Sequence, residues 1–119
     1  MFSTLLLCLT LNVYHESRGV SIEAQEAVAA ITMNRTKDKD YPSNVCKVVY
    51  APKAFSWTQQ HHRVTDKEAF AKAKAIALQY LQGKKNSTIG NRLYFNERRL
   101  GKRYNTPYKP IVLGGLMMY

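Results

Sequence analysis

The chain has 119 residues, which is enough for one compact domain and too few for two, so we expect a single domain over residues 1–119. Its 45% hydrophobic and 11% aromatic residues can supply an ordinary core. The formal charge of +10, from 18 Lys and Arg against 8 Asp and Glu, favours polyanionic partners such as nucleic acids, anionic lipids or anionic cell-wall polymers. Charge alone does not choose among these classes.

The first predicted helix covers about residues 3–16 and ends near Gly19, a common helix stop. Helical spacing places Leu9, Asn12 and Glu16 on one face, which the preceding apolar residues mark as the buried face. We therefore expect the carboxyl of Glu16 to be partly shielded from water, which raises its pKa. A carboxylic acid that stays protonated near neutral pH can act as general acid in the cleavage of a glycosidic bond.

The N-terminal apolar run differs from a signal peptide and from a membrane span. No basic residue precedes the run and no small-residue cleavage site follows it. A run of about a dozen residues is also shorter than the roughly 20 that cross a bilayer. We interpret it as the first core helix, so that release from the cytoplasm would use another route or a phage particle.

The two cysteines, Cys8 and Cys46, lie in apolar helical settings without a paired spacing. We favour two buried thiols, because free cysteine is commonly buried. A single disulfide between them stays open, since pairing cannot be deduced from sequence.

Two further helices follow, at about residues 22–35 and 66–82. Ser21 is a suitable N-cap for the first of them. Thr65 and Glu68 have the spacing of a capping box at the start of the second. A short helical turn after the first contributes valines to the core. These elements predict a mainly helical (α+β) domain, with a small β element in its second half.

The segment 51–64 shows no regular period and contains the only tryptophan of the chain, Trp57. Phe55 and Trp57 either line a carbohydrate-facing wall or fill the core under the loop, and both interpretations stay open. Residues 92–96 and 111–119 are predicted to form short strands or irregular extended segments.

Five short motifs occur in a fixed order along the chain. They are Tyr-His-Glu-Ser-Arg-Gly at 14–19, Gln-Glu-Ala-Val-Ala at 25–29, Asn-Arg at 34–35, Tyr-Pro-Ser-Asn-Val-Cys-Lys-Val-Val-Tyr at 41–50 and Phe-Ser-Trp at 55–57. Together they resemble the cell wall hydrolases related to the spore cortex-lytic enzyme SleB and its relative CwlJ. The resemblance is close over the first half of the chain and loose over the second.

This resemblance implies a lysozyme-like catalytic domain related to lytic transglycosylases. It also implies cleavage of the β-1,4 bond between N-acetylmuramic acid and N-acetylglucosamine in peptidoglycan. Glu16 matches the catalytic glutamate of the family, and Ser17 replaces its usual alanine. Asn96 and Leu116 stand where the family tends to carry histidine, so contacts on that wall are expected to differ. Small domains of this kind also occur in bacteriophages, which suggests an endolysin or virion lysin.

Glycosidases normally use two carboxylates, and the sequence assigns only Glu16 clearly. Glu97 is a candidate for the second, but we favour a surface ion pair with Arg98 or Arg99. We therefore expect a single-glutamate mechanism. In it the N-acetyl carbonyl or the C6 hydroxyl of the substrate replaces the missing group, and the latter gives a 1,6-anhydro sugar. Hydrolysis by water is the near alternative.

Eight residues are candidates for contacts with the glycan: Tyr14, Arg18, Gln25, Phe55, Ser56, Trp57, Tyr94 and Asn96. Asn34 and Arg35 are expected to tie the fold together through hydrogen bonds to loops. His15 is expected to point away from Glu16 by one helical step. No cofactor or metal is expected, because the adjacent His61 and His62 lack matching partners.

The expected partners are peptidoglycan strands, and also anionic cell-wall polymers, at the bacterial cell wall outside the cytoplasm. A different class of function is nucleic-acid binding, because residues 98–108 interleave basic residues with tyrosines. No helix-turn-helix, RNA-recognition or zinc-finger pattern supports this alternative. A catalytically inactive glycan-binding domain also stays open.

Overall fold

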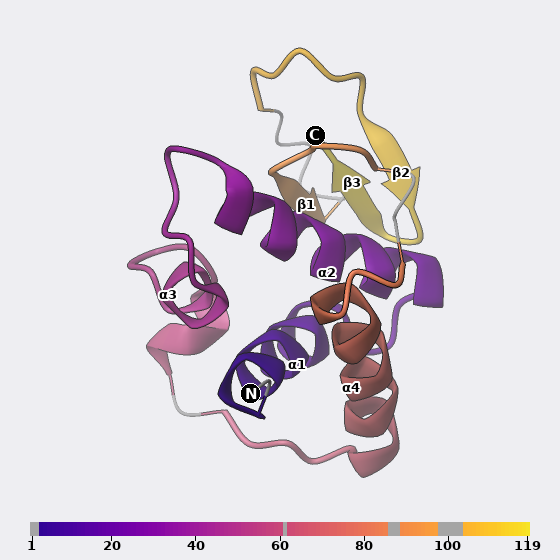
Figure 1. Ribbon diagram of the computed structural model, residues 1–119. Helices are drawn as coiled ribbons and strands as arrows, with labels where there is room; N and C mark the ends of the chain where they lie inside the picture. Colours follow the sequence, from indigo (N-terminus) through magenta and orange to yellow (C-terminus); the bar gives the residue numbers. More distant parts are fainter. Residues whose placement is uncertain (1–2, 61, 86–88, 98–103) are drawn as a thin grey trace.

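The computed structural model describes residues 3–60, 62–85, 89–97 and 104–119 (Figure 1). Its helices are α1 (Ser3–Ser17), α2 (Ile22–Lys37), α3 (Val45–Val49) and α4 (Lys67–Leu81), with a short 3-10 turn η1 (Ser56–Gln59). The strands β1 (Phe95–Glu97), β2 (Ile111–Leu113) and β3 (Leu116–Met118) form one sheet. The predicted mainly helical domain with a small β element is confirmed. Among the described residues, no helix is long and apolar enough to cross a membrane.

Helix α1 is the central helix, in contact with α2, α3 and α4 (Figure 1). Leu9 and Val13 are fully buried in it, and the alanines of α2 are small enough for the two helices to approach closely. Gly19 follows the helix with φ of 86°, a left-handed conformation that glycine adopts without a Cβ clash. This stop leaves Glu16 in the last turn of α1.

Side chains cap the starts of α2 and α4. Ser21 accepts a hydrogen bond from the backbone N–H of Ala24 at 3.2 Å, which confirms the predicted cap of α2. The capping box predicted at Thr65 is wrong. Asp66 is the N-cap of α4 and accepts from the N–H of Ala69 at 3.0 Å. The hydroxyl of Thr65 instead accepts a hydrogen bond from Arg18, in a contact between distant segments.

The sheet is antiparallel in the order β1-β3-β2, and its β2 strand contacts α2 (Figure 1). In the register of β1 and β3, Glu97 lies opposite Leu116. The C-terminal segment forms a hairpin of two strands, because the chain turns at Gly114 and Gly115, where Gly114 has φ of 59°. This hairpin brings the C-terminal residues back beside β1.

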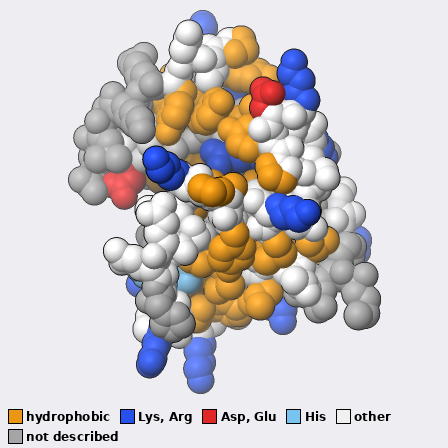
Figure 2. All heavy atoms as spheres, turned by 90° about the vertical axis from the view of Figure 1, so that its left-hand side faces the viewer, with side chains coloured by type: hydrophobic (Ala, Val, Ile, Leu, Met, Phe, Trp, Pro, Cys, Tyr) orange, Lys and Arg blue, Asp and Glu red, His pale blue; other side chains and the backbone are white. Residues whose placement is uncertain are grey.

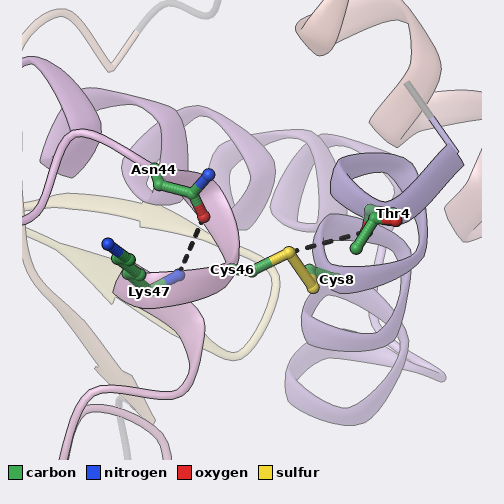
Figure 3. Close-up of a disulfide and its surroundings, with 5 residues drawn as sticks. All are labelled: Thr4, Cys8, Asn44, Cys46 and Lys47. Carbon is green, nitrogen blue, oxygen red and sulfur yellow. Dashed lines mark hydrogen bonds between the residues drawn. A yellow bond between two sulfur atoms is a disulfide. The ribbon is translucent and has the colours of Figure 1, made fainter. Parts of the chain in front are cut away.

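A disulfide joins Cys8 of α1 to Cys46 of α3 (Figure 3). The favoured interpretation of two buried thiols is therefore wrong. The packing of α3 against α1 brings the two Cα atoms to 5.3 Å, within the range that a disulfide spans. The two cysteines are 38 positions apart in the sequence, and neither segment gave a local sign of this contact.

One face of the molecule carries a broad band of hydrophobic side chains. Figure 2 shows this band on the face that lies at the left of Figure 1, where α3 and η1 are found, with Lys and Arg side chains around it. Tyr50, at the end of α3, is one of the large exposed hydrophobic residues.

Candidate active site

The side chain of Glu16 faces a cavity of about 790 Å³ between the end of α1, the loop to α2, and the sheet. Its lining residues come from widely separated segments: His15, Glu16, Arg18, Val20, Glu97, Gly114, Gly115 and Leu116. A cavity of this size is within the range of small-molecule sites in proteins, which is about 300–1,000 Å³. The catalytic candidate thus lies beside a space that can hold a sugar unit.

The pKa of Glu16 is raised from 4.5 to about 7. Burial of the carboxyl is the largest cause, because the charged form loses its hydration. The positive charge of Arg35 opposes this rise, and the negative charge of Glu97 adds to it. The rise in pKa expected from the position of Glu16 on α1 is therefore present. Such a carboxyl can donate a proton near neutral pH and accept one afterwards.

Arg35 is a buried cation close enough to Glu16 to act on its charge. Its guanidinium carbon lies 5.3 Å from the ring centre of Tyr41, 5.0 Å from that of Phe55 and 5.9 Å from that of Tyr94. The negative faces of aromatic rings partly replace the water that a buried guanidinium loses. This aromatic cage stabilises the positive charge of Arg35 close to Glu16.

Asn34 and Arg35 also fasten α2 to the segment before β1. Asn34 donates from Nδ2 to the backbone oxygens of Gly90 and Arg92, both at 2.9 Å. Arg35 donates from Nε to the backbone oxygen of Leu93 at 2.8 Å. The predicted structural role of this pair is confirmed.

His15 lines the cavity beside Glu16, so the expectation that it points away is wrong. The cavity extends around the end of α1, so His15 and Glu16, which are adjacent in its last turn, both line it. The His15 ring stacks on Trp57 with centroids 4.6 Å apart and lies 5.6 Å from the ring of His62. Burial lowers its pKa, and the charges of His62 and Arg18 lower it further. Its Nε2 is buried with no hydrogen-bond partner in the described part of the chain.

Arg18 connects the cavity to a second depression of about 570 Å³, which it also lines. Its Nη1 donates to the hydroxyl of Tyr14 at 2.6 Å and to Oγ1 of Thr65 at 3.1 Å. The Tyr14 hydroxyl also accepts from the backbone N–H groups of Thr65 and Asp66. Tyr14 is thus a buried anchor for the loop before α4, and Arg18 is held by neutral groups at the cavity wall.

Several of the other predicted glycan contacts lie away from the cavity of Glu16. Gln25 is buried, donates to the backbone oxygen of Val20 and borders the second depression. Phe55 is buried in the core, 3% exposed, with its ring 6.3 Å from that of Phe95. Tyr94 borders a separate depression of about 220 Å³ near the C-terminus. Of the eight predicted residues, Arg18 alone is among the residues that line the cavity with Glu16.

The three remaining candidates lie on neighbouring elements. Ser56 is exposed at the start of η1, and Trp57 is half-buried beside it. Asn96 lies half-buried in β1, next to Glu97. No group of three or more His, Cys, Asp or Glu side chains that could hold a metal ion occurs among the described residues.

Sequence reasoning missed most of the cavity wall formed by the sheet. Glu97, which we interpreted as a surface residue paired with Arg98 or Arg99, faces the same cavity as Glu16. The two arginines lie outside the described residues, so that ion pair stays untested. The Gly-Gly pair at 114 and 115 was the available signal, because such a pair predicts a tight hairpin turn.

A model of the cell wall hydrolase family matches residues 19–113 of this chain. The chain belongs to the cell wall hydrolase family. The matched region begins three residues after Glu16 and covers α2, α3, α4, β1 and β2.

Individual relatives align with this cell wall hydrolase over a shorter stretch. The spore cortex-lytic enzyme of Bacillus cereus is 43% identical over 44 residues, which are 37% of this chain and 17% of that protein. The spore cortex-lytic enzyme of Oceanobacillus iheyensis is also 43% identical over 44 residues, covering 37% of this chain and 16% of the relative. The aligned stretch therefore spans about a sixth of those proteins.

Solved structures resemble this cell wall hydrolase over nearly its whole length. The catalytic domain of the Bacillus cereus SleB protein has a TM-score of 0.74 and 26% identity, covering 99% of this chain and 91% of that one. The catalytic domain of the germination-specific lytic transglycosylase SleB from Bacillus anthracis has a TM-score of 0.71 and 25% identity, covering 95% and 91%. The predicted membership in the family of SleB is thus confirmed, and with it the predicted fold.

Proposed function

We propose that this domain cleaves the β-1,4 bond between N-acetylmuramic acid and N-acetylglucosamine in peptidoglycan, with Glu16 as general acid and then base. The observation that carries this proposal is the raised pKa of Glu16, about 7, at the wall of a cavity of about 790 Å³. The family match and the two SleB catalytic domains support the class of reaction.

The first step transfers the proton of Glu16 to the bridging oxygen while the bond from C1 of the muramic acid to this oxygen breaks. The Glu16 carboxylate then takes the proton of the C6 hydroxyl, and O6 attacks C1. The product is a 1,6-anhydro sugar, and Glu16 is protonated again. The similar Bacillus anthracis domain is described as a lytic transglycosylase, which supports this outcome over simple hydrolysis.

Burial of Glu16 and the charge of Arg35 favour the two successive steps of this reaction. Burial keeps Glu16 protonated before the first step, and the buried cation of Arg35 favours the carboxylate that the first step leaves. Arg18 lies at the cavity wall, where we propose that it contacts a carboxylate of the substrate. The formal charge of +10 would also draw the domain to anionic cell-wall polymers.

We place this activity outside the cytoplasm, at the bacterial cell wall. The Cys8–Cys46 disulfide supports this, because disulfides persist mainly in oxidising compartments. A bacteriophage endolysin or virion lysin is one setting for such a domain, and it stays a prediction. The nucleic-acid alternative depended on residues 98–108, of which 98–103 lie outside the described part of the chain.

The test is the clearance of purified peptidoglycan, followed by the mass of the released fragments. Glu16→Gln should abolish clearance while the circular dichroism spectrum and binding to sacculi are unchanged. Glu23→Gln is the matched control, since Glu23 is an exposed carboxylate in the first turn of α2. Clearance by the Glu16→Gln variant at the wild-type rate would refute the proposal.

A further inference from the structure

Two carboxylates from distant parts of the chain line one cavity. Glu16 reaches it from the last turn of α1, and Glu97 reaches it from the end of β1. The antiparallel register of β1 and β3 fixes the backbone of Glu97 opposite Leu116, which also lines the cavity. Glu97 therefore belongs to a paired strand on the sheet side of the cavity, across from the helix end.

The environments of these two carboxyls differ in the way that a two-carboxylate glycosidase requires. Glu16 is half-buried, whereas Glu97 is exposed to water. The negative charge of Glu97 acts on Glu16 and helps to raise its pKa, so the two groups are electrostatically coupled. Two carboxyls in unlike surroundings can divide the roles of acid and base. Glycosidases that hydrolyse their substrate use such a pair.

The sheet side of the cavity has open space at Gly115. This glycine lines the cavity, and a Cβ atom added to it would meet nothing within 4 Å. A sugar bound with its bridging oxygen at Glu16 would leave room there for water near Glu97. This arrangement rests on the role proposed above for Glu16.

We propose that Glu97 is the general base that activates water for attack on C1 of the muramic acid, so that this domain hydrolyses part of the bonds it cleaves. Glu16 gives its proton to the bridging oxygen as the bond to C1 breaks. Water forms the new bond to C1 and passes its proton to Glu97. Exchange with solvent then returns a proton to Glu16 and removes one from Glu97. Water and the C6 hydroxyl thus compete for C1, and Glu97 favours water.

The experiment compares the products of digested sacculi by liquid chromatography and mass spectrometry. The hydrolysed fragment is heavier than the 1,6-anhydro fragment by one water, so their ratio is measured directly. The wild-type domain should release both. Glu97→Gln should lower the ratio of hydrolysed to anhydro product by a factor of about 10² or more, the usual contribution of a general base. Glu23→Gln should leave the ratio unchanged.

A second variant covers the possibility that Glu97 acts only through its charge or its packing. In Glu97→Ala, added formate can occupy the vacated space as a carboxylate base and restore hydrolysis by water. The proposal requires this rescue. It is overturned if the wild type releases only anhydro product, or if Glu97→Gln shifts the pH profile while the product ratio stays constant. Loss of all clearance in Glu16→Gln tests the function of Glu16 separately, because it does not depend on the product ratio.

Discussion

The indole nitrogen of Trp57 donates a hydrogen bond of 2.8 Å to the side-chain oxygen of Asn12, which is fully buried in α1. Asn12 in turn donates to Oγ1 of Thr32 in α2 at 3.0 Å. Trp57 in η1 is thereby connected through Asn12 to both α1 and α2. Trp57 also stacks on His15 at the cavity. Its indole nitrogen therefore stabilises the fold, while its ring packs against a residue that lines the cavity of Glu16.

Trp57→Phe should lower the free energy of unfolding by about 1–3 kcal/mol, because the buried oxygen of Asn12 loses its donor. Chemical denaturation followed by circular dichroism measures this change. Tyr50→Phe is the control, since Tyr50 is 49% exposed and its ring lies 5.7 Å from that of Trp57. Equal losses in both variants would show that the hydrogen bond contributes nothing.

Cell-wall clearance should decline as the pH rises through about 7, the pKa of Glu16. The group must carry a proton to act as general acid, and above this pH most molecules have lost it. The initial rate of clearance between pH 5 and pH 9, at constant ionic strength, measures this dependence. A rate that keeps rising up to pH 9 would contradict the assignment of Glu16 as the acid.

Folding stability should depend on the same group. The pKa of Glu16 is higher in the folded protein, about 7, than its ordinary value of 4.5, so the folded state binds more protons between these values. Stability therefore falls as the pH rises from about 4.5 to 7, by at most about 3 kcal/mol. Glu16→Gln removes the ionisation and should be more stable than the wild type at pH 8. The difference in free energy of unfolding between the two proteins should shrink towards pH 4. A constant difference across the range would show that the ionisation of Glu16 is not its cause.

Reduction of the Cys8–Cys46 disulfide should lower the free energy of unfolding by about 3–4 kcal/mol, from the chain entropy of a closed loop of this length. Unfolding curves with and without a reductant measure the effect. The double variant Cys8→Ala with Cys46→Ala should be insensitive to the reductant. If the reductant does not change the unfolding curve of the wild-type protein either, the Cys8–Cys46 disulfide is absent.

Gly115 offers a way to narrow the cavity without disturbing the fold. A Cβ atom added to Gly115 would meet nothing within 4 Å, and the backbone φ of this residue lies outside the left-handed region. Gly115→Ala should retain activity, whereas Gly115→Phe should reduce clearance at least about tenfold, because misplacement of a polymeric substrate is costly. Thermal unfolding should be similar for both. Full activity of the Phe variant would place the substrate elsewhere.

Local signals in the sequence were sufficient for the helices. Hydrophobic periodicity gave the extents of α1, α2 and α4 to within a few residues, and Ser21 marked the start of α2. The start of α4 was misassigned by one residue, because the Thr65 hydroxyl is engaged by Arg18 from a distant segment. Rules that consider only neighbouring residues cannot predict a hydrogen bond from a distant arginine.

The sequence by itself determined that an acidic side chain, Glu16, ends an apolar helix and is partly shielded from water, since helical spacing is a local property. Only the tertiary structure decided what surrounds that carboxyl. Glu97 reaches the cavity through the register of β1 and β3, and Cys8 meets Cys46 through the packing of α1 against α3. These contacts depend on how distant segments fold together, and no pattern within either segment encodes them.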